Sequence, residues 1–482
     1  MASRLLLGEL GAIVGQEGLW TDTTRMKPYQ SDHKTGFWGN PSAVCFPQTT
    51  EHVQAIVQQC IRYGVPMVPR GAGTGRSGGA VPPDGGVVIS TEKMVQTREL
   101  NRESLFVEVE SGRILQSLQQ EVEEVGLFYP PDPASLAVCT LGGNVAENAG
   151  GPRAFKYGVT RDYVLGVEVV LPDGSLVQCG TRTRKGVVGY DMTGLMVGSE
   201  GTLGIMTSIL FRLLPKPAQQ KTLLALFSCV EDAALAVNQM VEAAVIPACI
   251  ELMDRHALAA AKEHAPYPID EKVKAALIIE VDGDAATLEE QIHRLPSLLE
   301  PARPLELIAA RDLEEQEQLW AIRRRLSESL RERYRFKMSE DIVVPKGKLP
   351  ELTRKVEEIA KPLPIDIAQY GHAGDGNLHV NFLWNEPEHR MIAHEAIETL
   401  FRVVLKLKGT ISGEHGIGLC KRPYLPWEQS KGLIRIQEQI KSAIDPKHLM
   451  NPGKIFPVPE GFPRPIFHQD DEVTIQLYPE EK

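Results

Sequence analysis

The sequence lacks an excess of basic residues, and it lacks long apolar runs. It contains 52 Lys and Arg residues against 63 Asp and Glu residues, a formal net charge of −11. No basic field is available to attract a nucleic-acid backbone or an anionic membrane, so we expect no nucleic-acid partner. No stretch is long enough to span a bilayer, and the opening "MASRLLLGELGAIVGQEGLW" lacks the apolar core of a signal peptide. These absences predict a cytoplasmic protein without a membrane span.

Closely spaced cysteines are also missing. The chain has seven cysteines, which lie far apart and form no CxxC pair. An odd number of scattered cysteines is typical of a reducing compartment. Without a cluster motif, this chain's own cysteines are not expected to build an iron–sulfur cluster.

The chain has 482 residues, of which 43% are apolar. This length is sufficient for two or three domains. The segment at residues 47–66 carries a single apolar stripe, which predicts a helix that Thr49 or Thr50 can cap and that ends at Gly64. The composition shifts at Pro215 and Pro217. Beyond them strands and helices alternate, which predicts a smaller α+β layer packed over the first domain. The proline-rich residues after Phe456 are expected to be unstructured.

The stretch "VPRGAGTGRSGGAVPPDGGVVIS", residues 68–90, contains a formal match to the dinucleotide fingerprint GxGxxG. In that fingerprint the third glycine opens a helix, whereas here Pro82, Pro83 and further glycines oppose one. We therefore predict a strand, a glycine-rich loop and a second strand. The backbone N–H groups of such a loop can converge on a diphosphate, and the alternative is a flexible surface loop.

Two further glycine clusters follow, "TLGGNVAENAGG" at residues 140–151 and "GSEGTLGI" at residues 198–205. Between them a hairpin is predicted, with its turn at residues 172–174. Three loops rich in backbone amides in one domain predict one long ligand that passes several backbone segments.

Histidines and a carboxylate gather between residues 370 and 416. In "YGHAGDGNLHVNFLW" the turn-forming residues 374–377 predict that His372 and His379 face each other across a hairpin or loop. His379 and Asn381 would share one face of the following strand. Polar groups on one face of an apolar strand need partners.

The segment "ISGEHGIG" supplies the next candidates, Glu414 and His415. His372, His379 and Glu414 could hold a divalent metal such as zinc with a position open for substrate. The alternative is structural histidines, because the spacing matches no standard zinc signature. His415 could be a general base beside the metal, or it could simply be hydrogen-bonded in a glycine turn.

A carboxylate substrate would need a fixed cation, and the arginine-rich segment at residues 320–345 offers several. Most arginines on an amphipathic helix are solvated, so only one or two of these are expected to face a site.

Taken together, these motifs resemble those of a known protein family. The stretches "PRGAGTGRSGG", "TLGGNVAENAGG", "KYG", "VGSEGTLGI", "GHAGDGNLH", "SGEHGIG" and "DPKHLMNPGKIF" occur in this order between about residues 40 and 456. Together they resemble the FAD-linked oxidases of the vanillyl-alcohol oxidase and p-cresol methylhydroxylase superfamily. Within it they are most similar to glycolate oxidase (glycolate dehydrogenase) D subunits and D-lactate dehydrogenases.

The resemblance implies an α+β fold, in which a two-subdomain FAD-binding domain of p-cresol methylhydroxylase type carries an α+β, ferredoxin-like cap. The implied division is an FAD-binding domain at 1–215 with its core at about 40–215, a cap at 216–410, a segment at 411–456 that returns to the flavin, and a proline-rich tail at 457–482.

Residue roles follow from the resemblance as expectations. His415 corresponds to the catalytic base, and Arg323 and Asn381 correspond to substrate contacts. The metal ligands, for zinc, manganese or iron, correspond to His372, His379 and Glu414. The implied FAD contacts are Arg70, Gly71, Ala72, Gly73, Thr74, Gly75, Ser77, Gly78, Gly79, Pro131, Asp132, Thr140, Gly142, Gly143, Asn144, Ala146, Asn148, Gly158, Glu200, Gly201, Ile205 and Asn451.

Two positions depart from the family pattern. Lys337 lies two positions out of register with the family's lysine, so it receives no role. Members with covalent flavin often carry histidine directly after the "RSGG" loop, where this chain has Ala80. Alanine offers no nucleophile, so FAD is predicted to be non-covalent.

The implied activity is oxidation of a D-2-hydroxy acid, glycolate or D-lactate, to the 2-oxo acid by hydride transfer to flavin N5, with a metal-assisted histidine base. Electrons would pass to a partner such as an iron–sulfur subunit, to a quinone or to a soluble acceptor. The alternatives are a D-2-hydroxyglutarate dehydrogenase, a transferase like alkylglycerone-phosphate synthase, a non-catalytic FAD-binding subunit and a zinc hydrolase with glycine loops.

Overall fold

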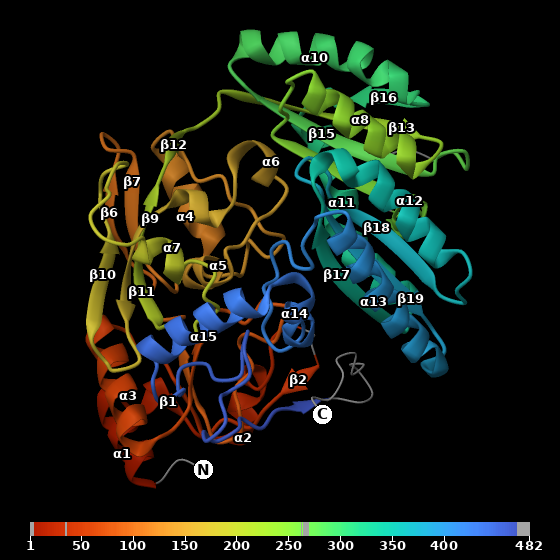
Figure 1. The fold of residues 1–482 in the computed structure, drawn as a ribbon. Coiled ribbons are helices and arrows are strands. Elements are labelled where there is room, and N and C mark those ends of the chain that lie inside the picture. Colours follow the sequence, from red (N-terminus) through yellow and green to blue (C-terminus); the bar gives the residue numbers. More distant parts are fainter. Residues whose placement is uncertain (1–3, 34–35, 262, 264–268, 470–482) are drawn as a thin grey trace.

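A computed structural model describes residues 4–33, 36–261, 263 and 269–469. Two parts lie side by side, an N-terminal part up to residue 215 and a central part at residues 216–410 (Figure 1). The chain then returns to the N-terminal part. We propose these boundaries as the domain division. Among the described residues, no helix is long and apolar enough to cross a bilayer.

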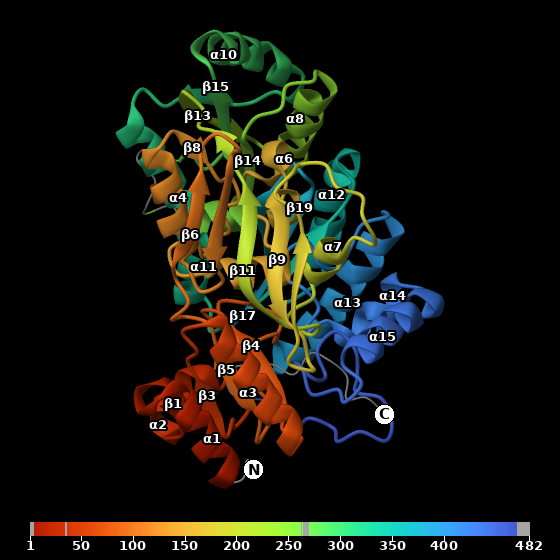
Figure 2. The ribbon, with the colours of Figure 1, turned by 90° about the vertical axis from the view of Figure 1, so that its left-hand side faces the viewer.

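The N-terminal part contains two main sheets, one below the other in Figure 2. The four-stranded sheet has the order β1 (Leu19–Trp20), β3 (Ala43–Cys45), β5 (Val87–Ser90), β4 (Met67–Arg70), with β3, β5 and β4 parallel. The antiparallel five-stranded sheet has the order β10 (Leu176–Gly180), β9 (Val164–Val170), β11 (Ile205–Arg212), β7 (Phe106–Glu110), β6 (Thr97–Asn101).

The helices of the N-terminal part follow from local sequence. As predicted, α3 (Thr50–Tyr63) begins after Thr49, whose side chain accepts the His52 N–H, and it ends at Gly64 in the left-handed conformation. Its apolar stripe packs with α1 (Arg4–Val14) and the four-stranded sheet in one core. The other helices are α2 (Thr23–Met26), α4 (Leu115–Glu124), α5 (Leu141–Glu147), α6 (Ala154–Tyr157) and α7 (Met192–Met196).

Helix α5 corrects one expectation, because the second glycine cluster is not a loop throughout. Thr140 caps the helix by accepting the Gly143 N–H at 3.3 Å, and Leu141 and Val145 are fully buried. The helix ends at Asn148, which adopts the left-handed conformation with φ 53°. Tertiary packing and the cap outweigh the poor helix propensity of two glycines.

The central part is built on one seven-stranded antiparallel sheet. Its order is β16 (Glu306–Ala309), β13 (Gln219–Phe227), β15 (Ala275–Gly283), β14 (Cys249–Asp254), β18 (Asp366–His372), β19 (Asn377–Trp384), β17 (Phe336–Val343). One face is covered by α8 (Val230–Glu242), α10 (Ala285–Leu299), α12 (Leu349–Ala360) and α13 (Arg390–Lys406). The other face is covered by α9 (Arg255–Ala261) and α11 (Leu313–Arg333).

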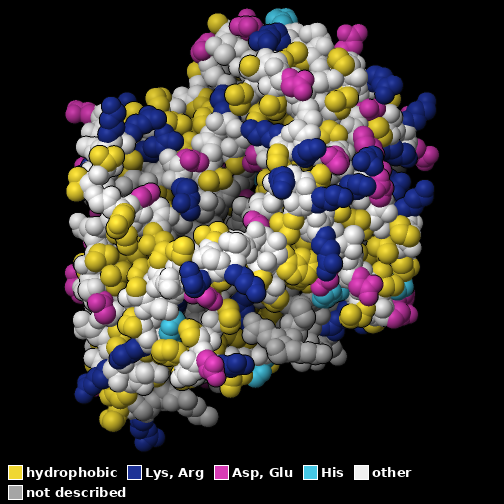
Figure 3. All heavy atoms as spheres, in the orientation of Figure 1, with side chains coloured by type: hydrophobic (Ala, Val, Ile, Leu, Met, Phe, Trp, Pro, Cys, Tyr) yellow, Lys and Arg dark blue, Asp and Glu magenta, His cyan; other side chains and the backbone are white. Residues whose placement is uncertain are grey.

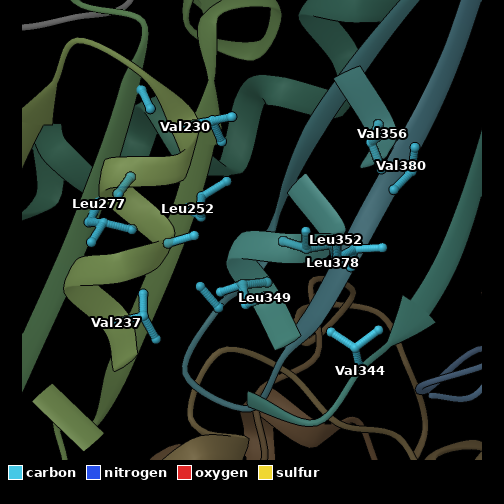
Figure 4. Packing of buried hydrophobic residues seen from close by; sticks show 14 of the residues in the cluster. Val230, Val237, Leu252, Leu277, Val344, Leu349, Leu352, Val356, Leu378 and Val380 are labelled. Atoms are coloured by element: carbon cyan, nitrogen blue, oxygen red, sulfur yellow. The ribbon is translucent and has the colours of Figure 1, made fainter. Parts of the chain in front are cut away.

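Helices on both faces explain why several strands of the central part carry apolar residues on both faces of the sheet. On β13, Leu223 and Ala225 pack under one helix layer, and Leu224 and Leu226 pack under the other. Figure 4 shows side chains of α8 and α12 directed at neighbouring strands of the sheet.

The chain beyond the central part closes the fold. Helices α14 (Leu425–Glu428) and α15 (Lys431–Ile444) lead back to the N-terminal part, where Asn451 N–H donates to the Met67 carbonyl at 2.7 Å. We expected residues 457–482 to be unstructured; residues 470–482 lie outside the described residues, and the part up to residue 469 contacts the N-terminal part. Strand β20 (His468–Gln469) pairs with β2 (Phe37–Trp38), and the Lys454 Nζ lies 4.4 Å from the Phe467 ring centroid. A short pair, β8 (Leu127–Phe128) and β12 (Leu214–Pro215), leads into the central part.

Asp254, at the end of β14, gives a testable pH dependence of stability. Its carboxyl oxygens accept the N–H groups of Ala257 at 2.9 Å and Gln369 at 2.7 Å. Burial raises the pKa of Asp254 to about 7 despite these bonds. Between pH 4 and 7 the folded chain then binds a proton that the unfolded chain has released, so rising pH removes stability.

We expect denaturant unfolding of wild type to lose on the order of 3 kcal/mol relative to Asp254→Asn between about pH 4 and pH 7. Asp284→Asn is the control, because Asp284 is an exposed helix cap whose pKa is lowered by its bonds to Thr287. Parallel stability profiles of wild type and Asp254→Asn over that range would contradict this prediction.

Candidate active site

A cavity of about 800 Å³ lies between the N-terminal and central parts. Figure 3 shows the molecule hollowed between the two parts, with Lys and Arg side chains around the hollow. The N-terminal part lines the cavity with the loop after β4, with α5 and with the loop before β11. The central part lines it with α11 and the β18–β19 hairpin, and the returning chain adds Glu414 and His415. One cavity therefore receives groups from segments far apart in the sequence.

Most of the expected site residues line this cavity. They are Arg70, Gly71, Ala72, Gly73, Thr74, Gly75, Gly79, Asp132, Thr140, Gly142, Gly143, Asn144, Ala146, Glu200, Gly201, Ile205, Arg323, His372, His379, Glu414 and His415. Seven others are not among its lining residues, namely Ser77, Gly78, Pro131, Asn148, Gly158, Asn381 and Asn451.

Some of these seven residues support the segments that line the cavity through hydrogen bonds. Asn451 donates to the carbonyls of Gly79 and Glu200, and the Gly78 N–H donates to the Asp32 carboxylate at 2.7 Å. Asn381 is fully buried and donates to the carbonyls of Ala368 and His379. In this arrangement Asn381 shapes the strand instead of facing the cavity.

The glycine-rich side of the cavity is tightly packed. A Cβ added at Gly71 would lie 2.0 Å from the Thr140 hydroxyl, and one at Gly142 would lie 2.7 Å from the Ser111 Cβ. Side chains are thus excluded where the backbone approaches the cavity. The buried Ser111 hydroxyl, which also lines the cavity, makes no hydrogen bond within the described part of the chain. Amide-rich walls and an unused hydroxyl fit a phosphate-bearing nucleotide such as FAD.

Opposite the glycines, the β18–β19 hairpin brings its two histidines together, as the sequence predicted. The ring centroids of His372 and His379 are 5.4 Å apart, and the rings are nearly perpendicular. Glu414 Oε1 lies 3.8 Å from His372 Nε2 and 3.6 Å from His379 Nε2. The three ligand atoms lie within 4.8 Å of one another. Two imidazole nitrogens and a carboxylate at this spacing fit a divalent ion such as zinc.

Glu251, on β14, helps to position this group of metal-type ligands. It was not among the site residues predicted from the sequence. It is fully buried and binds both His372 Nδ1 and Arg323 Nε. Burial alone would raise the pKa of Glu251, but the charges of Arg323 and His372 outweigh burial and lower it. With Nδ1 held by Glu251, the Nε2 atom of His372 is left facing Glu414.

Asp341, on β17, was also missed, and it anchors the segment that carries Glu414 and His415. One carboxylate oxygen accepts the N–H groups of Gly413, Glu414 and His415 at 2.8, 2.7 and 3.1 Å. The other accepts the Asn377 side-chain amide at 2.6 Å. Asp341 is fully buried, and electrostatic interactions with His415 and then with the Lys421 ammonium lower its pKa despite burial. The acidic pair Glu340 and Asp341, directly before the apolar run at residues 342–344, was the signal that could have revealed it.

His415 lies against the metal-type group. Its ring stacks on His379 with a centroid distance of 5.5 Å and an interplanar angle of 13°. Burial lowers the pKa of His415, although the Asp341 and Glu414 carboxylates oppose that shift. A lowered pKa favours the neutral imidazole, which is the form that can accept a proton.

Arg323, on α11, was expected to bind a substrate carboxylate, and it already pairs with a carboxylate of the protein. Arg323 binds Glu251 through Nε, and its guanidinium lies 4.9 Å from the Tyr370 ring centroid. Lys337 is not among the lining residues, and its Nζ donates to the Ser327 hydroxyl at 2.9 Å.

Glu200, expected beside the cofactor, also anchors the returning chain. Its carboxylate accepts the N–H groups of Ile417 and Gly418, both at 2.8 Å. Burial raises the pKa of Glu200 to about 7, although these two bonds oppose the shift. Segment 413–418 is therefore fixed by Asp341 at one end and by Glu200 at the other.

Comparisons with known proteins identify the relatives of this chain. Residues 41–180 match the family model "FAD binding domain", and residues 216–455 match "FAD linked oxidases, C-terminal domain". The chain is 38% identical over 431 residues to glycolate oxidase subunit GlcD of Bacillus subtilis, covering 89% of this chain and 92% of that protein. It is 35% identical over 425 residues to D-lactate dehydrogenase of Anaerostipes hadrus, covering 86% and 89%.

The fold resembles that of p-cresol methylhydroxylase solved with substrate bound, with a TM-score of 0.77 and 16% identity. The superposition covers 94% of this chain and 96% of that one. This likeness confirms the expected fold class.

The Glu200 anchor gives a test that needs no substrate. In Glu200→Gln a neutral amide replaces the carboxylate, so both N–H groups lose a charged acceptor and one of them faces an NH2 group that cannot accept. We expect amide hydrogen exchange at residues 417 and 418 to accelerate about 10- to 100-fold. Glu147→Gln is the matched control, because Glu147 lines the same cavity and no N–H of segment 413–418 donates to it in the described structure. Equal exchange in the two variants would refute the anchoring role.

Proposed function

This chain belongs to the FAD-linked oxidases, as an FAD-dependent oxidoreductase of the 2-hydroxyacid dehydrogenase type, and we propose that it oxidises glycolate or D-lactate to the 2-oxo acid. One observation carries this proposal. A single cavity joins a glycine-lined nucleotide cradle to a group of two histidines, one glutamate and a further histidine. A hydroxy acid at their junction would meet a redox cofactor, a metal site and a base together.

His415 is proposed as the base that removes the proton from the substrate hydroxyl. Its side chain is 16% exposed, and burial lowers its pKa, which favours the neutral form. The hydrogen bonds from segment 413–415 to Asp341 hold its backbone, and the His379 ring limits its orientation. A general base held in this way is available for the proton without reorganisation.

Arg323 is proposed to orient the substrate carboxylate. Its Nε is bound to Glu251, and the two remaining nitrogens of the guanidinium can face a carboxylate in the cavity. Asn381 is less favoured as a substrate contact, because it is fully buried.

Two groups would complete the site. His372, His379 and Glu414 would hold a divalent ion, and the glycine loop, α5 and the loop before β11 would hold FAD. When bound, FAD supplies an acceptor for two electrons, and the ion supplies Lewis-acid polarisation. Ala80 also lines the cavity and offers no nucleophile, which supports the expectation of non-covalent FAD.

A partner is proposed as the exit for electrons. All seven cysteines are free thiols that form no disulfide, and their sequence spacing offers no cluster motif. The Bacillus subtilis relative is named as a subunit, which supports assembly with a second protein. We propose that this partner carries an iron–sulfur centre, with a quinone or a soluble acceptor as the alternative.

Anaerobic mixing tests the proposed reaction. Flavin-loaded protein is mixed in turn with glycolate, D-lactate, L-lactate and D-2-hydroxyglutarate, and the loss of oxidised-flavin absorbance is followed with and without prior chelation. We expect glycolate or D-lactate to bleach the flavin and chelation to suppress bleaching, because the ligand set requires its ion.

The variant His415→Ala should keep its FAD and lose flavin reduction by about 100-fold or more, within the range typical of a general base. His293→Ala, on the exposed surface of α10, is the control. If the protein is yellow and none of the acids bleaches its flavin, the proposed reaction is contradicted. That result would favour a transferase without net redox change or a non-catalytic subunit.

A further inference from the structure

Two side chains that line the cavity share one carboxylate behind its wall. Glu251 Oε1 is hydrogen-bonded to Nδ1 of His372, and Glu251 Oε2 accepts the Nε–H of Arg323. The Glu251 side chain is fully buried, and within the described chain it is not among the residues that line the cavity, whereas His372 and Arg323 are. Glu251 therefore cannot touch a ligand in the cavity, and it can act only through these two partners.

The fold fixes Glu251 between its partners. Strand β14 pairs with β18 so that Glu251 lies opposite His372. Helix α11 covers this face of the sheet, and the Arg323 guanidinium lies 4.9 Å from the centroid of the Tyr370 ring on β18. Among the residues that the structure describes, no other side chain forms a hydrogen bond or an ion pair with Glu251. The two partners thus divide a single negative charge between them.

The charge of Glu251 acts on two ligand sites. A carboxylate on one ring nitrogen of a histidine makes the other nitrogen a stronger metal ligand, and in His372 that other atom is Nε2, which faces Glu414. The Arg323 guanidinium attracts the same carboxylate from the other side. A change that weakens the attraction of Glu251 to one partner therefore strengthens its interaction with the other.

We propose that Glu251 is a positioning residue that couples the two ligands of the site, so that a carboxylate bound at Arg323 strengthens metal binding at His372 and the metal strengthens carboxylate binding. This inference rests on the proposed function, which assigns the substrate carboxylate to Arg323. That carboxylate competes with Glu251 for the guanidinium, and Glu251 then interacts more strongly with His372. The two effects are equal in size by thermodynamic linkage. The cavity thus favours the complex that holds both the acid and the ion.

Direct contact between the acid and the ion would also produce such coupling. Glu251 separates the two causes, because it lies behind the cavity wall and contacts neither ligand. Coupling that passes through Glu251 disappears when the charge of Glu251 is removed. Coupling that arises from direct contact survives that change.

The test measures zinc affinity with and without a carboxylate. Zinc is titrated calorimetrically into chelator-stripped, FAD-loaded protein, alone and with saturating propionate, which has a carboxylate and no hydroxyl. We expect propionate to tighten zinc binding by wild type about 10-fold, within the usual range of couplings between sites. In Glu251→Gln, where the charge is gone, propionate should change zinc affinity less than about 2-fold. In wild type, zinc should tighten propionate binding by the same factor.

Glu280→Gln is the matched control. Glu280 is a buried carboxylate on the neighbouring strand β15, it lines the cavity, and it accepts the Trp320 Nε1–H at 3.0 Å. This variant should keep the wild-type response to propionate. An equal response in wild type and Glu251→Gln would assign the coupling to direct contact and would overturn the inference. A wild-type protein that binds no zinc, or whose zinc affinity ignores propionate, would overturn it as well.

Arg323→Gln provides the second arm. Without the guanidinium, Glu251 interacts with His372 alone, so we expect zinc affinity about 10-fold higher than in wild type, with no further response to propionate. A purely structural pair of Arg323 and Glu251 predicts weaker zinc binding instead, and that result would contradict the inference. Removal of a nearby positive charge also favours zinc, so the substitution is repeated in Glu251→Gln. There it should change zinc affinity less than about 3-fold, and an increase equal to that in the wild-type background would overturn the inference.

The double variant also covers the case in which Glu251→Gln fails to fold because Arg323 loses its partner. Glu251→Gln/Arg323→Gln loses both charges together. Its zinc affinity should be about 10- to 100-fold lower than that of Arg323→Gln, because His372 then lacks its supporting carboxylate. Equal zinc affinities in these two variants would overturn the inference.

These binding measurements need no turnover, so they separate this inference from the proposed function. If no hydroxy acid reduces the flavin but the effect of propionate on zinc depends on Glu251, the proposed reaction fails and the coupling stands. If glycolate or D-lactate reduces the flavin and propionate leaves zinc affinity unchanged, the coupling fails and the reaction stands.

Discussion

The site depends on one buried carboxylate, that of Asp341. Burying a charge without partners would be costly, and here four N–H groups offset that cost, three of them from consecutive backbone positions. The geometry that satisfies Asp341 also fixes where Glu414 and His415 can lie. Glu414 then reaches both histidines of the β18–β19 hairpin, and His415 stacks on one of them. The positions of the metal-type group and of the proposed base therefore both depend on one set of hydrogen bonds.

Two further buried carboxylates extend this arrangement across the molecule. Glu251 links Arg323 to His372 inside the central part, and Glu200 of the N-terminal part holds the backbone just beyond His415. The returning segment thus bridges the two parts that enclose the cavity. Because these anchors are charge-assisted and shielded from water, they restrain the chemical groups more strongly than surface ion pairs could.

The sequence predicted those features that leave a local pattern. The cap and stop of α3, the strand–loop–strand around the first glycine cluster, and the hairpin that brings His372 to His379 all follow from neighbouring residues. Helix α5 was missed, because its two glycines argue against a helix and only its buried Leu141 and Val145 reveal the packing that favours one. Family resemblance, more than periodicity, located the cofactor side of the cavity.

Glu251 and Asp341 could not be assigned from pattern alone. Each is a fully buried acidic residue in a strand. The partners lie 72 and 121 positions away for Glu251, and 72 to 74 positions away for the backbone bonds of Asp341.

Metal affinity of an Asp341→Asn variant tests the central claim most directly. Zinc is titrated calorimetrically into chelator-stripped wild type, Asp341→Asn and, as a control on the same sheet, Asp254→Asn. An amide cannot accept three backbone N–H groups as a carboxylate does, so we predict zinc affinity about 10- to 100-fold weaker in Asp341→Asn and unchanged in the control. Wild-type affinity in Asp341→Asn would show that the ligands assemble without this anchor and would contradict the account.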